Sequence, residues 1–228
     1  MKILKFIINI VLVSLVCICA YKIVDTNEKY KKVDDIYEVI KTEKEDIEKE
    51  DFQITHKNYR GWIKINNTNI DYPVLQANDN KYYLDKDMNG KYLIAGSIFM
   101  NYTNNGFDDQ NTILFGHNMK NGTMFADLTK YMKQDFFYGN NNIDIEISNG
   151  QHLEYEVFSV YVTDAKDNYI ISKFKSINEY KKTLHKIKKK SMYPLDIELN
   201  EEDKIITLST CYYAVNDGRL VVHGKLKK

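Results

Sequence analysis

Apolar residues run almost without interruption over residues 6–21, and lysines flank the run on both sides. This length is close to the roughly 20 residues that an α-helix needs to cross a bilayer, and flanking lysines can extend toward the headgroups. The sequence therefore predicts a membrane anchor over residues 1–24. Because Lys2 and Lys5 precede the run, the positive-inside rule predicts a single-pass protein of the cell membrane, with a cytoplasmic N-terminus and an extracellular remainder.

Two other interpretations of this segment stay open. A cleaved signal peptide has the same positive start and apolar middle, although no small-x-small cleavage site follows here. A lipoprotein signal would lipidate Cys17 or Cys19, but the bulky Val16 and Ile18 stand where a small residue is needed. Both details favour an uncleaved anchor.

A charged segment with helical periodicity follows the anchor. Apolar residues recur between residues 31 and 50 at Val33, Ile36, Ile40 and Ile47. This spacing predicts a one-sided amphipathic helix. We therefore expect a helical spacer over residues 25–51 and a folded domain over residues 52–228.

Beyond residue 52 the pattern changes to short apolar runs and to strict alternation, which is typical of strands. The expected strands cover residues 61–65, 69–74, 112–115, 143–147, 153–162, 204–211 and 219–225. A turn over residues 148–150 makes a hairpin of two of them. One helix interrupts the series over residues 176–190, with Ser176 as its expected N-cap. Many strands and one late helix predict a mostly-β barrel or sandwich.

The charge balance and the cysteines narrow the function. Lys plus Arg and Asp plus Glu number 32 each, so the chain lacks the positive excess that nucleic-acid binding favours. Cys17 and Cys19 lie in the apolar run, where small packing residues are expected. Cys211 is therefore alone in the exported part, without a partner for a disulfide. It is either a reactive thiol or a buried inert one.

Three residue types that suit nucleophilic catalysis lie at strand ends. Cys211 ends the strand over 204–211, His117 follows the strand over 112–115, and Arg219 begins the last strand. A cationic neighbour populates a thiolate near neutral pH, histidine can protonate a leaving amine, and a guanidinium suits an oxyanion. Taken singly, the histidine could be structural and the arginine a surface residue.

Several segments resemble the sortase family of cysteine transpeptidases. Thr207-Leu208-Ser209-Thr210-Cys211 with the later Arg219 resembles the sortase signature, and the stretch over 112–119 (TILFGHNM) is similar to the histidine segment. The stretches over 61–65 (GWIKI), 70–74 (IDYPV) and 79–84 (DNKYYL), and a late helix between Phe174 and Tyr193, are similar to class B in particular. The resemblance implies an eight-stranded β-barrel with an N-terminal helix and a late inserted helix, and a catalytic domain over residues 52–228.

The resemblance also implies a reaction. Cys211 is expected to attack the threonine carbonyl of a C-terminal sorting signal in a secreted protein, which gives a thioacyl-enzyme while His117 protonates the departing amine. Arg219 is expected to stabilise the substrate and the oxyanion. An amine of a peptidoglycan precursor or stem peptide of a Gram-positive cell wall then takes the acyl group. The implied partners are these two substrates and the membrane, with no nucleic acid.

Weaker expectations concern the neighbours of these residues. Ser209 and Thr210 could contact substrate, and because successive strand residues face opposite ways, at most one of them should do so. Tyr212 and Tyr213 could shape the groove or merely pack in a loop. Asn118, next to the histidine, could support the site.

The sequence implies neither a metal nor a cofactor. His56, His152 and His185 carry no local motif, and His223 lies in the middle of a strand. We find no His, Cys and Asp cluster with ligand spacing. Two alternative functions stay open, namely a peptide-binding module without catalysis and a thiol hydrolase that gives its acyl group to water.

Overall fold

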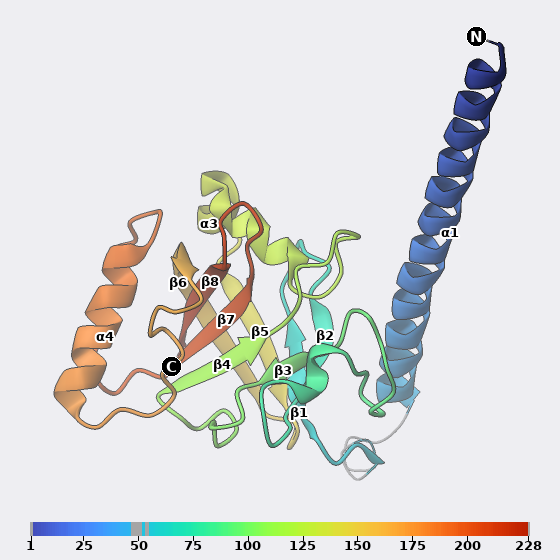
Figure 1. Cartoon of the computed structure of the whole chain (residues 1–228). Coiled ribbons are helices and arrows are strands. Elements are labelled where there is room, and N and C mark those ends of the chain that lie inside the picture. The colour runs from blue at the N-terminus through green and yellow to red at the C-terminus, as the bar shows by residue number, and fades with distance from the viewer. Residues whose placement is uncertain (1, 47–51, 53–54, 228) are drawn as a thin grey trace. The chain divides into compact units, whose positions relative to one another are not determined.

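The computed structural model describes residues 2–46, 52 and 55–227 (Figure 1). The chain divides into two compact units, residues 1–42 and 43–228. The end of the expected spacer, residues 47–51, lies outside the described residues.

The first unit is helical throughout its described length. Helix α1 (Lys2–Asp46) continues without a break through the apolar run and into the charged segment. Side chains are exposed along the apolar run, and the helix is long and apolar enough to cross a membrane. These properties agree with the predicted anchor.

The second unit is a closed barrel of eight strands. Its elements are β1 (Tyr59–Lys64), β2 (Asp71–Leu75), η1 (Tyr82–Leu84), β3 (Ile98–Met100), β4 (Asn111–Phe115), η2 (Ala126–Met132), α3 (Gln134–Gly139), β5 (Asn142–Ile147), β6 (His152–Asp164), α4 (Ile177–Lys190), β7 (Ile205–Cys211) and β8 (Gly218–Leu226). The strand order is β1-β2-β3-β4-β7-β8-β6-β5. The pairs β2–β3 and β4–β7 are parallel, and the others are antiparallel. The mostly-β fold and its barrel form are thus confirmed.

The structure confirms the seven expected strands, with small shifts at their ends, and adds β3. Strand β3 has three residues, too few for an alternating pattern to be recognised. The short helices η2 and α3 were also missed for this reason. The turn at residues 148–150 is confirmed, because Gly150 N donates to the carbonyl of Ile147 (2.8 Å) and Gly150 has a positive φ of 84°.

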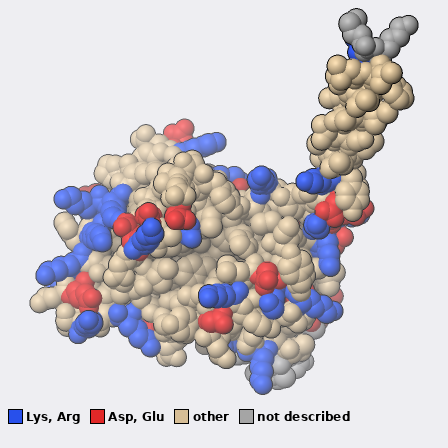
Figure 2. Space-filling view, viewed as in Figure 1, with Lys and Arg blue, Asp and Glu red and all other residues tan. Residues whose placement is uncertain are grey.

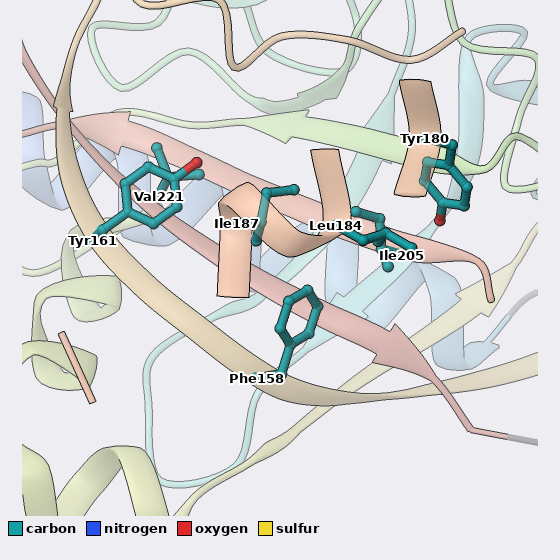
Figure 3. Packing of buried hydrophobic residues seen from close by; sticks show 7 residues of the cluster. All are labelled: Phe158, Tyr161, Tyr180, Leu184, Ile187, Ile205 and Val221. Carbon is teal, nitrogen blue, oxygen red and sulfur yellow. The ribbon is translucent and has the colours of Figure 1, made fainter. Parts of the chain in front are cut away.

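Helix α4 is also confirmed, together with its N-cap. The Ser176 hydroxyl accepts a hydrogen bond from Glu179 N (3.2 Å). One face of the helix is buried on strands β6, β7 and β8 (Figure 3). The buried cluster consists of Phe158, Tyr161, Tyr180, Leu184, Ile187, Ile205 and Val221. Burial of this apolar face, rather than helix propensity, holds α4 to the barrel.

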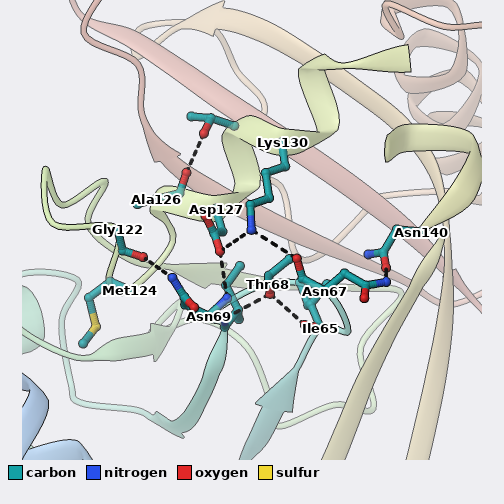
Figure 4. Close-up of polar contacts among 12 residues, drawn as sticks. Ile65, Asn67, Thr68, Asn69, Gly122, Met124, Ala126, Asp127, Lys130 and Asn140 are labelled. Carbon is teal, nitrogen blue, oxygen red and sulfur yellow. Dashed lines mark hydrogen bonds and ion pairs between the residues drawn. The ribbon is translucent and has the colours of Figure 1, made fainter. Parts of the chain in front are cut away.

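The turn between β1 and β2 is held by polar contacts with η2 and the residues after α3 (Figure 4). Asn67 has a positive φ of 59°, which asparagine tolerates in tight turns. Its side-chain amide donates to Asn140 (2.9 Å), and Asn69 N donates to Asp127 (2.7 Å). Lys130 then bonds both Asp127 and the Asn67 carbonyl. These bonds fix one end of the barrel.

Candidate active site

The register of three neighbouring strands brings the candidate residues to one rim of the barrel. In the antiparallel pair of β7 and β8, Cys211 is directly opposite Arg219. In the parallel pair of β4 and β7, Phe115 is opposite Ser209. His117 and Cys211 each follow these partners by two residues. Because parallel strands end at the same edge, the imidazole and the thiol leave the sheet together.

A glycine lets the chain leave β4 at this point. Gly116 N donates to the Ser209 carbonyl (3.3 Å) and so extends the pairing by one residue. A Cβ at Gly116 would meet ring carbons of Phe125 at 2.9 Å and would clash with Ile98. Only glycine therefore fits directly before His117.

All three side chains line a single cavity of about 230 Å³. Its lining residues are Asn80, Leu84, Phe99, Phe115, His117, Ala165, Tyr169, Ile170, Ser209, Thr210, Cys211 and Arg219. Cys211 is half-buried, so its thiol is neither sealed in the interior nor fully exposed. The lining is largely apolar apart from the candidate groups, as is usual for sites that bind organic ligands.

Hydrogen bonds hold the histidine and the end of β7 in place. His117 Nε2 lies 2.7 Å from the carbonyl oxygen of Leu84. A carbonyl can only accept, so Nε2 carries a proton and donates. Asn118 donates to the Cys211 carbonyl (2.9 Å), and the Thr210 hydroxyl donates to the Gly116 carbonyl (2.8 Å). The ends of β4 and β7 are thus joined on both sides of the nucleophile candidate.

Arg219 has no carboxylate partner among the residues that the structure describes. One guanidinium nitrogen donates to the carbonyls of Asp217 (3.3 Å) and Gly218 (3.0 Å). Asp217 has a positive φ of 50°, a conformation that aspartate tolerates in tight turns. An arginine has five N–H donors, so this arrangement leaves donors and an uncompensated positive charge at the cavity.

Tyr169 joins the loop after β6 to the rim. Its hydroxyl lies 3.0 Å from the Ser209 hydroxyl. Burial raises the pKa of Tyr169, while the Ser209 hydrogen bond and the positive charge of Arg219 oppose that rise. A neutral phenol therefore lies between the end of β7 and the guanidinium.

The structure places the neighbouring residues relative to the cavity. Both Ser209 and Thr210 line it, and the expectation that at most one of them contacts substrate stays a prediction. The cavity lies at the end of β7, where it meets residues from both faces of the strand. Each of the two is only 2% exposed. Tyr212 and Tyr213 are not among the lining residues, and Tyr213 is 70% exposed.

Another cavity, of about 580 Å³, contains none of the candidate residues. It lies between α4 and residues 196–201. Its volume is larger, but the chemistry of a site is set by its reactive groups, and we therefore place the candidate active site at Cys211. Among the described residues no group of three or more His, Cys, Asp or Glu side chains could hold a metal ion.

Sequence reasoning missed most of the apolar cavity wall. The missed residues are Asn80, Leu84, Phe99, Phe115, Ala165, Tyr169 and Ile170. Tyr169 and Ile170 come from an irregular loop with no periodic pattern, and Phe99 comes from the unrecognised β3. The stretches over 79–84 and 112–119, quoted above for their resemblance, contain Asn80, Leu84 and Phe115, but neither was singled out as cavity wall.

A half-buried thiol that shares a cavity with an imidazole and an uncompensated guanidinium has the groups that a cysteine-dependent acyl-transfer enzyme needs. The sequence profile of the sortase domain matches residues 63–227. Sortase B of Listeria monocytogenes is 42% identical over 77% of this chain and 72% of that protein. Sortase B of Staphylococcus aureus is 34% identical over 100% of this chain and 98% of that protein.

Solved structures agree with these sequence relatives. A structure of Clostridium perfringens sortase B has a TM-score of 0.76 and 38% identity over 79% of this chain and 100% of that chain. A Staphylococcus aureus sortase B–substrate complex has a TM-score of 0.78 and 33% identity over 88% of this chain and 98% of that chain. The chain belongs to the sortase family. Its relatives are of class B, and it is accordingly a cysteine transpeptidase of that class.

Proposed function

We propose that Cys211, His117 and Arg219 carry the transpeptidase reaction on a secreted protein that bears a C-terminal sorting signal. The observation that supports this proposal best is their common cavity, which three adjacent strands build at one rim. The enzyme cleaves the signal after threonine and joins the new carboxyl group to an amine of cell-wall peptidoglycan.

In the first half of the reaction, the Cys211 thiolate attacks the threonine carbonyl and the C–N bond breaks. His117 gives a proton to the departing amine, and a thioacyl-enzyme remains. The Leu84 carbonyl supports the role of His117, because it accepts from Nε2–H and so orients the ring. Nδ1 is then the ring nitrogen left to exchange a proton.

Arg219 stabilises the negative charge that develops on the carbonyl oxygen. Its donors are aimed from the strand directly opposite the nucleophile, and its charge is not neutralised by a described carboxylate. Fixed donors in a partly dry cavity act on the transition state without reorganising. Tyr169 and Ser209 form the wall beside it and exclude water from one side.

In the second half, an amine attacks the thioester and releases Cys211. One related structure is of sortase B complexed with triglycine, which supports a peptide amine as the acceptor. For this chain we propose the amine of a peptidoglycan precursor or stem peptide. Helix α1 anchors the enzyme in the cell membrane with a cytoplasmic N-terminus, since Lys2 and Lys5 precede the apolar run.

A peptide assay tests this function. The full chain in detergent is incubated with a quenched sorting-signal peptide, with and without triglycine. We expect cleavage in both cases and a peptide–triglycine product only with the amine. Cys211→Ala should abolish both products, whereas the matched variant Cys17→Ala/Cys19→Ala should retain both. Cleavage that persists in Cys211→Ala would contradict the mechanism, and cleavage that ignores the amine would identify a hydrolase.

A further inference from the structure

Helix α4 concentrates positive charge in a chain that has no net charge. It contains six lysines and a single acidic residue, Glu179. The Glu179 carboxylate already accepts a hydrogen bond from Lys175 N (2.7 Å). Blue side chains accordingly gather in Figure 2 over the position that α4 has in Figure 1.

Three of the six lysines bind partners outside the helix. Lys181 pairs with Glu201 (2.9 Å), Lys190 pairs with Asp167 (3.0 Å), and Lys188 donates to the carbonyl of Ile197 (2.6 Å). Lys182, Lys186 and Lys189 form no hydrogen bond or ion pair within the described part of the chain, although the charge of Lys186 still acts on Asp167, the partner of Lys190. All three are exposed.

The three unpaired lysines form one stripe. They follow one another at i, i+4 and i+7, and so lie on one face of the helix. The buried residues of α4 are Tyr180, Leu184 and Ile187. Each of them lies two residues before one of the three lysines. Two residues correspond to about 200° around an α-helix, so the lysine stripe points directly away from the barrel. The helix dipole favours basic residues only in the last turn of a helix. Lys182 and Lys186 lie before that turn, so the dipole does not explain their presence.

We propose that Lys182, Lys186 and Lys189 are a membrane-docking stripe that binds the phosphates of anionic phospholipid headgroups. The proposal rests on the proposed membrane anchorage, because helix α1 keeps the domain within reach of a lipid surface. Each lysine close to an anionic bilayer strengthens binding about fivefold, and three lysines together on the order of 100-fold. A row of flexible ammonium groups suits a flat array of phosphates, for which no shaped pocket is needed.

The last turn of α4 contacts the loop that supplies part of the cavity wall. Lys190, at the end of the helix, pairs with Asp167. Asp167 lies between Ala165 and Tyr169, and both of these line the cavity. Docking through the stripe would therefore fix the orientation of the cavity with respect to the membrane.

Lysine footprinting tests the stripe directly. The full chain is placed in nanodiscs of phosphatidylcholine alone or with phosphatidylglycerol, and the acetylation rate of each lysine is measured by mass spectrometry. We expect slower acetylation of Lys182, Lys186 and Lys189 only in the anionic discs, by about tenfold or more, and recovery at high salt. The exposed Lys120 and Lys133 serve as controls and should react equally in both.

Either of two other results would overturn the proposal. Equal acetylation rates of the three lysines in neutral and anionic discs would show that the stripe does not recognise headgroup charge. Protection by a soluble phosphate polymer but not by anionic discs would assign the stripe to a polymer instead of lipid. Co-elution of the chain with discs of both compositions reports the anchor separately, so its failure is distinguishable from failure of the stripe.

Discussion

Two histidines next to strand β7 have opposite environments. His117 lies at the rim, partly exposed, with one ring nitrogen bonded to the Leu84 carbonyl. His223 is fully buried beside Thr207 in the middle of β8. Burial lowers the pKa of His223 to about 3, so this ring stays neutral.

Hydrogen bonds define the state of the buried ring. The Thr207 hydroxyl donates to Asn111 (2.7 Å), and it must therefore accept from His223 Nδ1 (2.9 Å). His223 Nε2 then accepts from the Tyr161 hydroxyl (3.0 Å). Both nitrogens are satisfied in the neutral form, and no proton can be exchanged without breaking the chain. The position relative to a strand, rather than the residue type, therefore separates a histidine that can react from a structural one.

After loss of the nucleophile itself, the largest effect is expected at the rim histidine. Replacing His117 by Gln removes the proton donor for the leaving amine, and kcat/KM should fall by about 10³-fold. Thermal stability should change little, because the side chain is partly exposed. Rates with the quenched peptide and a thermal melt measure both quantities. A loss below tenfold would move His117 out of the chemistry.

The next effect concerns the shape of the rim cation. Arg219→Lys keeps the charge but loses the fork of donors, and we expect kcat/KM to fall by about 10²-fold. Lys225→Arg on the same strand is the matched control and should retain activity. Turnover of Arg219→Lys near that of the parent would leave Arg219 with a structural role only.

The buried histidine should affect stability instead of activity. His223→Gln leaves polar partners unsatisfied and should lower the free energy of unfolding by about 1–3 kcal/mol, while the activity per folded molecule stays close to the parent value. Denaturant titration and active-site counting separate these effects. A selective loss of activity with unchanged stability would contradict the assignment of His223.

The same histidine predicts a pH dependence of stability. Its pKa is about 3 in the folded protein and near 6.5 when unfolded, so below pH 6.5 the unfolded chain binds more protons. The contribution of His223 is complete above pH 6.5 and is lost as the pH falls toward 3, by up to about 1.4 kcal/mol per pH unit. His223→Gln should flatten this slope. An unchanged slope would exclude His223 as its source.

The smallest effect tests how the rim histidine is positioned. A Cβ at Gly96 would lie 2.5 Å from the Leu84 carbonyl oxygen, the group that accepts from His117. Gly96→Ala should therefore displace that carbonyl and reduce kcat by about tenfold. Gly106 also has a positive φ (64°), but a Cβ there meets nothing within 4 Å. Gly106→Ala therefore introduces backbone strain without a steric clash and serves as the control. Equal activity of the two variants would contradict the proposal that the Leu84 carbonyl positions His117.

Local patterns predicted a mostly-β barrel or sandwich, whereas the resemblance to the sortase family implied the eight-stranded barrel and the roles of the three rim residues. Alternation located β5 to β8, and the strand ends placed Cys211, His117 and Arg219 at turns. The cavity wall was not predictable in the same way. Tyr169 and Ile170 belong to an irregular loop, whose position depends on tertiary contacts such as the bond from Asn111 to the Ile171 carbonyl (2.9 Å).

Peptide mapping by mass spectrometry decides whether Cys211 carries the acyl group during the reaction. The full chain is mixed with a sorting-signal peptide without an acceptor amine, quenched in acid and digested. We expect a thioester that joins the threonine carbonyl to Cys211, that disappears when triglycine is added, and that does not accumulate in His117→Gln. An acyl group on any other residue, or cleavage without any acyl-enzyme, would contradict the role of Cys211 as nucleophile.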